Sequence, residues 1–143
     1  MLVKFKKLLP TATIPTKAYP TDAGFDLYAA ETAVIRPGET VKVNTGIACA
    51  PPQGYFFKVF DRSSMGSKGI LVNAGVIDNS YRGPIIVCLT NLSNGDDYDT
   101  HTINVGDKIA QMVLLPSYEV IATEVEDLDE SERGDKGFGS SGK

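Results

Sequence analysis

The sequence contains few residues that could hold a metal ion or cross-link the chain. Its 143 residues include two cysteines and one histidine. Cys49 and Cys88 lie far apart, each inside an apolar run, and we expect them to act as buried small hydrophobes rather than as a disulfide or a metal site. Together with the lone His101 they are too few for a structural zinc site. A chain of this length can bury a sizeable core without disulfides.

The sequence also lacks an excess of positive charge and a long apolar run. There are 14 Lys and Arg against 18 Asp and Glu, a net charge of −4, which argues against general affinity for nucleic acid or an anionic membrane. A local basic pocket for one small anion remains compatible with this balance. No apolar run approaches the ~20 residues of a membrane span, and residues 1–10 lack the apolar core of a signal peptide. We expect one cytoplasmic domain.

No stretch carries a sustained helical period, whereas short strand patterns recur along the chain. Strands are expected within residues 2–9, 23–30, 34–35, 40–49, 55–60, 69–72, 85–89, 100–105 and 108–115. The stretches between them are rich in Pro, Gly, Asn and Asp, which favour turns. Many short strands at this spacing predict an all-β sandwich or barrel.

The end of the sequence differs in composition from the rest. Residues 124–133 are acidic with few apolar side chains, and residues 134–143 are rich in glycine and serine. Such a segment cannot bury enough surface to fold alone. We therefore expect a β core over residues 1–123, followed by an acidic linker and a mobile tail over residues 124–143.

An acidic residue lies in a polar stretch, residues 73–83, between the apolar runs 69–72 and 85–89. Short polar side chains between β-branched runs predict a hairpin. Asp78 would then lie where a strand turns, with Tyr81 three residues later. A turn held by two strands can present a carboxylate to a ligand. The alternative is an ordinary solvent-exposed turn acid.

A second stretch, residues 62–69, is dense in hydroxyls, glycines and cations. Arg62, Ser63 and Ser64 offer the donors and the positive charge that a polyphosphate requires. The alternative is a surface turn in which Ser63 caps a short helix. The spacing of a P-loop is absent.

The remaining candidate site residues lie in the C-terminal tail and at two single positions. Residues 137–142 combine glycines and serines with Phe138, an exposed aromatic suited to stacking on a base, although an ordinary flexible terminus has the same composition. Asp26 and Gln111, taken singly, fit satisfied edge or surface residues. No carboxylates cluster at a chelating spacing, so any Mg²⁺ would be held mainly by substrate phosphates.

Taken together and in order, five segments resemble the trimeric dUTPase family, the deoxyuridine triphosphate nucleotidohydrolases. The segments are AGFDLYAA at 23–30, RSSMGSKG at 62–69, AGVIDNSYRG at 74–83, GDKIAQMV at 106–113 and RGDKGFGSSG at 133–142. Each is weak alone, but the ordered set spans nearly the whole chain and is highly specific.

The resemblance implies a jelly-roll-like β-barrel that assembles as a homotrimer, with three active sites each built from all three chains. The implied reaction is the Mg²⁺-dependent hydrolysis of dUTP to dUMP and pyrophosphate, which keeps uracil out of DNA and supplies dUMP for thymidylate synthesis. The substrate is a small molecule, and no nucleic-acid or membrane partner is implied.

The resemblance also assigns roles to residues. Asp78 would activate a water that attacks the α-phosphorus, and Tyr81 would pack against the deoxyribose and exclude a 2′-hydroxyl. The substrate-binding residues implied beside them are Asn73, Gly75, Val76 and Ile77, with backbone groups that read the uracil edge. Phosphates would be held by Arg62, Ser63 and Ser64, with Gln111 near the α-phosphate and Asp26 holding Mg²⁺ through water. Arg133, Phe138, Gly139 and Ser140 match a tail that closes over a neighbouring site, Phe138 stacking on uracil.

Some positions depart from the family pattern. Asp61 precedes Arg62 where the family usually has Pro or a small neutral residue, which would place a negative charge beside the phosphate site. Ser64 occupies a common glycine position, and Asp135 and Lys136 replace small residues in the tail. These departures bear on affinity and on tail dynamics rather than on the reaction.

Two other functions are compatible with parts of the sequence. One is a dCTP deaminase or its bifunctional relative, although no Glu is placed near the hairpin for deamination. The other is a catalytically idle β-trimer that binds nucleotide or a protein partner, for which residues 91–101 would be the candidate surface. The intact Asp78 and the Phe138 tail argue against an idle protein.

Overall fold

The computed structural model describes residues 1–95 and 97–137 and is built almost entirely of strands. They are β1 Lys4–Lys7, β2 Gly24–Tyr28, β3 Ala33–Ile35, β4 Thr40–Asn44, β5 Ile47–Ala50, β6 Tyr55–Phe60, β7 Ile70–Asn73, β8 Val76–Ile77, β9 Ile86–Asn91, β10 His101–Ile103 and β11 Lys108–Pro116, with a short helix α1 Ser63–Gly66 and a 3-10 turn η1 Asp97–Asp99. The all-β prediction is confirmed. Within these described ranges no helix is long and apolar enough to cross a membrane.

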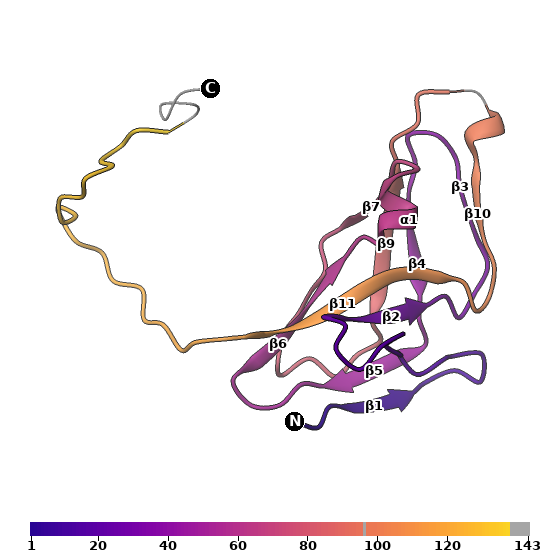
Figure 1. The fold of residues 1–143 in the computed structure, drawn as a ribbon, viewed down its shortest axis with the longest axis horizontal. Helices are drawn as coiled ribbons and strands as arrows, with labels where there is room; N and C mark the ends of the chain where they lie inside the picture. The colour runs from indigo at the N-terminus through magenta and orange to yellow at the C-terminus, as the bar shows by residue number, and fades with distance from the viewer. Residues whose placement is uncertain (96, 138–143) are drawn as a thin grey trace.

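The strands pair antiparallel in four sheets. A four-stranded sheet has the order β2-β11-β6-β8, a three-stranded sheet the order β4-β9-β7, and β1 pairs with β5 and β10 with β3. The long strand β11 crosses the middle of the molecule, and the chain beyond it leaves the core (Figure 1). The arrangement is a jelly-roll-like sandwich, in which the ladders between described strands do not close into one barrel.

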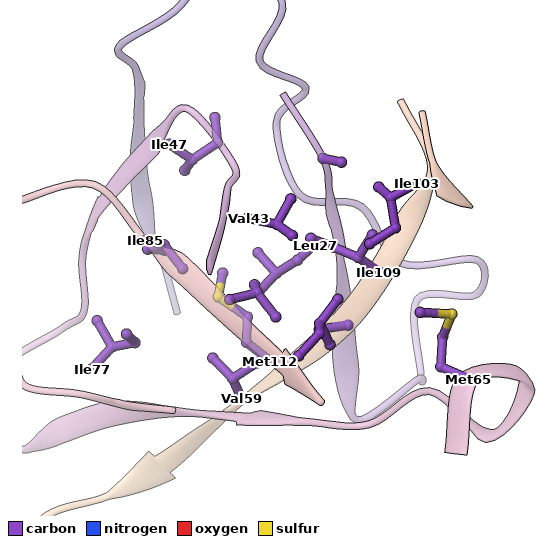
Figure 2. Packing of buried hydrophobic residues seen from close by; sticks show 14 of the residues in the cluster. Leu27, Val43, Ile47, Val59, Met65, Ile77, Ile85, Ile103, Ile109 and Met112 are labelled. Atoms are coloured by element: carbon purple, nitrogen blue, oxygen red, sulfur yellow. The ribbon is translucent and has the colours of Figure 1, made fainter. Parts of the chain in front are cut away.

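The core lies between the sheets and is filled by aliphatic side chains from most of the strands. Leu27 on β2, Val43 on β4 and Met112 on β11 are completely buried and converge in Figure 2. Both cysteines are free thiols; Cys49 is buried and Cys88 half-buried. Burial raises the pKa of Cys49 to about 11, so this thiol stays protonated at neutral pH.

The strand predicted over residues 40–49 is interrupted at Thr45 and Gly46, so the prediction of one continuous strand is wrong. The Thr45 hydroxyl donates to the Ile85 carbonyl at 2.8 Å, and Gly46 has a φ of 64°. A Cβ on Gly46 would lie 2.8 Å from the Ala12 Cβ. The bend moves the chain from one sheet to another, where β5 pairs with β1.

The hairpin predicted over residues 73–83 is also only partly correct. Strands β7 and β9 do pair antiparallel, with Val72 opposite Leu89. Between them, however, the chain crosses to the other sheet, where Ile77 of β8 pairs with Phe57 of β6. Burial of the Ile77 side chain in the core fixes this crossing. We call residues 73–83 the crossing connection.

The last described stretch, residues 117–137, contains no helix or strand. It extends away from the core in Figure 1, and its large apolar side chains are exposed. These are Tyr118, Val120, Ile121, Val125 and Leu128.

Asn91 is only 1% exposed, and its side chain joins three segments of the chain. These contacts lead to a prediction about stability. Its Nδ2 donates to the Ile35 carbonyl at 3.1 Å and to the Asp99 carbonyl at 2.8 Å, and its Oδ1 accepts from the Ser93 amide. Asn91→Ala leaves buried acceptors unpaired, so we expect the free energy of unfolding to fall by about 2 kcal/mol.

The measurement is urea-induced unfolding at one fixed protein concentration. The matched control is Asn94→Ala, an exposed asparagine of the same loop, for which we expect a change below about 0.5 kcal/mol. Equal effects of the two substitutions would contradict the role given to Asn91.

Candidate active site

A polar pocket with a volume of about 460 Å³ lies where β2, β11 and the β6–α1 junction meet. Strand register brings its residues together, because Asp26 lies opposite Gln111 and Gln111 lies opposite Phe60, shortly before α1. The pocket is lined by five residues that the sequence analysis singled out: Asp26, Arg62, Ser63, Ser64 and Gln111. It also contains Asp22 and Lys108.

At the centre of the pocket Asp26 pairs with two cations. Its Oδ2 lies 2.7 Å from the Lys108 Nζ, and its Oδ1 lies 3.0 Å from the Arg62 Nε. Arg62 is held further by Nη1, which donates to the Lys108 carbonyl at 3.1 Å and to the Ser64 hydroxyl at 3.3 Å. The hydrogen bond and negative charge of Asp26 raise the pKa of the Lys108 ammonium. Lys108 is therefore charged at neutral pH, and both cations line the pocket.

Helix α1 presents two hydroxyls beside these cations. Its N-cap is Arg62, with extended backbone angles and no side-chain cap, so the expectation that Ser63 caps the helix is wrong. Ser63 is the first residue with helical backbone angles and so lies inside the helix. Ser63 and Ser64 are exposed, whereas Met65 is buried and anchors the helix against the core (Figure 2).

Gln111 is held in place from two sides. Its Nε2 donates to the Asp61 carbonyl at 2.8 Å, and a Cβ on Gly24 would lie 2.7 Å from its Oε1. The Asp61 carboxylate accepts a hydrogen bond from the Val72 amide of β7 and does not line the pocket. The negative charge expected from Asp61 beside the phosphate site is thus directed to a strand amide and not into the pocket.

The donor set of the pocket fits a metal ion that arrives with substrate, and not one held by protein alone. Both oxygens of Asp26 are already paired. Across residues 1–95 and 97–137 no group of three or more His, Cys, Asp or Glu could hold an ion. Mg²⁺ commonly takes its ligands from phosphates and water, with few carboxylates. Asp26 and the pocket residue Asp22 could serve as such outer partners.

The crossing connection lies away from this pocket within one chain. Ile77 is on β8, the last strand of the order β2-β11-β6-β8, so three strand spacings, about 14 Å, separate it from Asp26 on β2. Asp78 and Tyr81 are exposed, and the Tyr81 hydroxyl donates to the Pro84 carbonyl at 3.0 Å. Asn73, Gly75 and Val76 belong to the same connection. None of these residues lines the pocket.

The turn at the start of the crossing connection is strained and clamped. Among the described residues Ala74 is the one non-glycine with a positive φ, 65°, and Gly75 follows with a φ of 99°. The Lys58 Nζ donates to the Ala74 carbonyl at 2.6 Å, and the Val59 amide donates to the Gly75 carbonyl at 2.8 Å. A Cβ on Gly75 would lie 3.0 Å from Val59. Strand β6 therefore fixes the position of this turn.

Arg133, the one predicted tail residue that the structure describes, does not line the pocket. Arg133 is exposed, and its Nε donates to the Lys136 carbonyl at 2.9 Å. Phe138, Gly139 and Ser140 lie outside the described residues. Sequence reasoning gave no role to Lys108 or Asp22. The only sequence signal for Lys108 is that a cation follows directly on the Gly-Asp turn. This signal becomes informative only when β11 is known to pair with β2.

The fold and the pocket define an all-β protein with a site of cations and hydroxyls suited to a phosphate chain. The sequence profile of the dUTPase family matches residues 11–142. The chain is 41% identical over 140 residues to the deoxyuridine 5'-triphosphate nucleotidohydrolase of Monkeypox virus, covering 98% of this chain and 90% of the viral one. The Variola virus enzyme of the same name is also 41% identical, with 92% of its length covered.

Solved structures agree with this assignment. The Staphylococcus bacteriophage 80alpha dUTPase with dUpNHpp superimposes with a TM-score of 0.92 at 31% identity, covering 99% of this chain and 98% of the phage chain. A mutant dUTPase from phage phi11 of S. aureus, described with a structural Mg(II) ion, has a TM-score of 0.83 at 29% identity, covering 91% of this chain and 100% of that chain. This chain belongs to the dUTPase family, whose enzymes hydrolyse dUTP to dUMP and pyrophosphate. The resemblance seen in the sequence is confirmed.

The hydrogen bond from Lys58 to the Ala74 carbonyl leads to a prediction about activity. Lys58→Met removes a charge-assisted hydrogen bond from the strained turn, and we expect kcat/KM for dUTP to fall about tenfold. Lys58→Arg keeps a donor and should retain most of the activity. Steady-state kinetics with thermal unfolding as a control checks this. Unchanged kcat/KM in Lys58→Met would show that β6 pairing alone fixes the turn.

Proposed function

We propose that this chain hydrolyses dUTP in a site that combines the pocket around Asp26 and Arg62 of one copy with the crossing connection of another. The observation that carries the proposal is their separation within one chain, at opposite edges of the sheet β2-β11-β6-β8. In the pocket both oxygens of Asp26 are paired with cations, and Asp22 accepts a hydrogen bond from the Tyr19 amide. Asp78 is exposed but lies outside the phosphate pocket, so the pocket and the crossing connection are complementary halves.

A homotrimer with shared sites brings the halves together. The apolar side chains that one chain leaves exposed support assembly: Val76 and Tyr81 in the crossing connection are 58% and 43% exposed, and the chain beyond β11 exposes further apolar groups. Burial of such groups favours association. Residues 1–123 form the core of each subunit, and residues 124–143 are the linker and tail that close a neighbouring site.

In the mechanism Asp78 acts as general base. Its carboxylate takes a proton from a water molecule, whose oxygen attacks the α-phosphorus of dUTP. The bond from the α-phosphorus to the bridging oxygen breaks, and pyrophosphate leaves with that bond's electron pair. A positioned general base typically contributes about 10² to 10⁴ in rate. Asp78 suits the role because its side chain is exposed and follows directly on the core-anchored Ile77.

The phosphate chain is held by the pocket. Arg62 and the hydroxyls of Ser63 and Ser64 bind its oxygens, with Gln111 near the α-phosphate. Positive charge fixed at this position stabilises the charge that develops on the leaving pyrophosphate. When bound with the substrate, Mg²⁺ supplies further charge stabilisation at the phosphate oxygens. Asp26 would hold that ion through water.

Selectivity comes from the crossing connection and the tail. Tyr81 packs on the deoxyribose and leaves no room for a 2′-hydroxyl. Backbone groups of Gly75, Val76 and Ile77, with Asn73 beside them, read the uracil edge and crowd its C5 position. Arg133, Phe138, Gly139 and Ser140 close the site, with Phe138 stacked on the base. Closure excludes bulk water while the reacting water stays bound.

The function is tested by pyrophosphate release in the presence of Mg²⁺ from dUTP, dCTP, dTTP and UTP in separate reactions. We expect release from dUTP alone, because the base and sugar contacts reject the other three. Deamination of dCTP would instead place the chain with the dCTP deaminases, and no release from any nucleotide would indicate an idle binding protein.

The sharing of sites is tested with two inactive variants. Asp78→Asn lacks the base, and Arg62→Ala lacks the phosphate-binding guanidinium; each alone is expected to lose nearly all turnover while dUMP binding persists in Asp78→Asn. When the two chains are unfolded, mixed in equal amounts and refolded, about a quarter of the sites combine an intact pocket with an intact crossing connection. Turnover of the refolded mixture should recover to about a quarter of that of the unsubstituted protein. A mixture as inactive as its components would show that each chain supplies both groups to its own site.

A further inference from the structure

The two cations on Asp26 are held very differently. Arg62 has three acceptors: Asp26 Oδ1 at 3.0 Å, the Lys108 carbonyl at 3.1 Å and the Ser64 hydroxyl at 3.3 Å. The Lys108 ammonium has a single hydrogen-bond partner among the described residues, Asp26 Oδ2 at 2.7 Å, with the Tyr28 ring 5.8 Å away. The side chain of Lys108 is also 39% exposed, against 28% for Arg62. Arg62 is fixed, and Lys108 is free to move.

Lys108 lies in the pocket that also holds Ser63, Ser64 and Gln111. A lysine ammonium on a flexible four-carbon stem can change partners at little cost, whereas a guanidinium held by several acceptors cannot. A triphosphate entering the pocket carries several negative charges and offers the ammonium more acceptor oxygens than one carboxylate does. Its arrival favours transfer of the ammonium from Asp26 to phosphate.

We propose that Lys108 is a substrate-binding residue that exchanges partners, pairing with Asp26 in the empty site and with a phosphate of dUTP in the complex. The exchange frees Asp26 Oδ2, which can then accept a hydrogen bond from a water molecule of the phosphate-bound Mg²⁺. In the empty site Lys108 keeps the Asp26 carboxylate neutralised and oriented; in the complex it compensates phosphate charge. This inference rests on the proposed function and extends it to a residue without an assigned role.

The proposal differs measurably from a purely structural role for Lys108. If Lys108 only orients Asp26, its removal has no further effect once Asp26 has lost its charge. If Lys108 exchanges partners, its contact with phosphate survives the loss of the Asp26 charge. That contact then contributes more to binding, because no ion pair has to be broken first. The two roles therefore predict opposite outcomes in a double-mutant cycle.

The experiment measures binding of dUpNHpp by calorimetry, in EDTA so that no metal contributes, to the full-length chain. The variants are Lys108→Met, Asp26→Asn and the double substitution. We expect Lys108→Met to weaken binding about tenfold in the presence of Asp26, as for one lost charge-assisted hydrogen bond, and by a larger factor in the Asp26→Asn background. No effect of Lys108→Met in that background would overturn the exchange.

Two controls keep the result specific. Lys42→Met removes an exposed lysine of β4 that does not line the pocket, and it should leave the affinity unchanged. Lys108→Arg should keep most of the affinity, and thermal unfolding establishes that every variant is folded. Failure of the unsubstituted chain to bind dUpNHpp with Mg²⁺ added in place of EDTA would overturn the proposed function itself. The exchange is decided by the difference between the two Lys108→Met effects.

Discussion

The pocket depends on one carboxylate that is paired on both of its oxygens. Asp26 holds the Arg62 guanidinium and the Lys108 ammonium within 3.0 Å, and these three side chains come from β2, the β6–α1 junction and β11. A half-buried acid paired with two cations fixes their positions, and the three side chains together carry one net positive charge, with Asp22 as the second acid of the pocket. The neighbouring serines and Gln111 are arranged around this centre.

A second constraint is the crossing connection, which leaves the sheet of β7 and β9 to pair with β6. Burial of Ile77 and the Lys58 clamp on Ala74 hold it there. Because β8 is at the opposite edge of the sheet from β2, the acid and the phosphate pocket of one chain lie apart, and in our proposal they face different neighbours. In our proposal one chain cannot complete a site by itself, so identical chains must assemble. Dissociation of the assembly would therefore abolish catalysis.

Much of the fold and the candidate site could be predicted, and the failures have physical causes. The strands and the donors Arg62, Ser63 and Ser64 were recognised because alternating apolar residues and donor-rich turns leave local signals. Asp26 and Gln111 leave no such signal, and their roles came from the resemblance of the ordered segments to the family. The break at Gly46 was missed because it depends on close contact with Ala12. The side-chain position of Asp61 depends on the Val72 amide, and no local pattern records such a partner.

The sequence by itself determined the family, the all-β class and the types of side chain available for phosphate binding, because these follow from short-range patterns and from ordered motifs. Tertiary structure alone decided which of those side chains meet. The register of β11 against β2 places Lys108 opposite Tyr28, two residues from Asp26, where the two side chains form an ion pair. The sheet order places Asp78 far from both. Pairing between distant strands is set by the packing of the whole core, so a residue's partner across a sheet cannot be deduced from its neighbours in the chain.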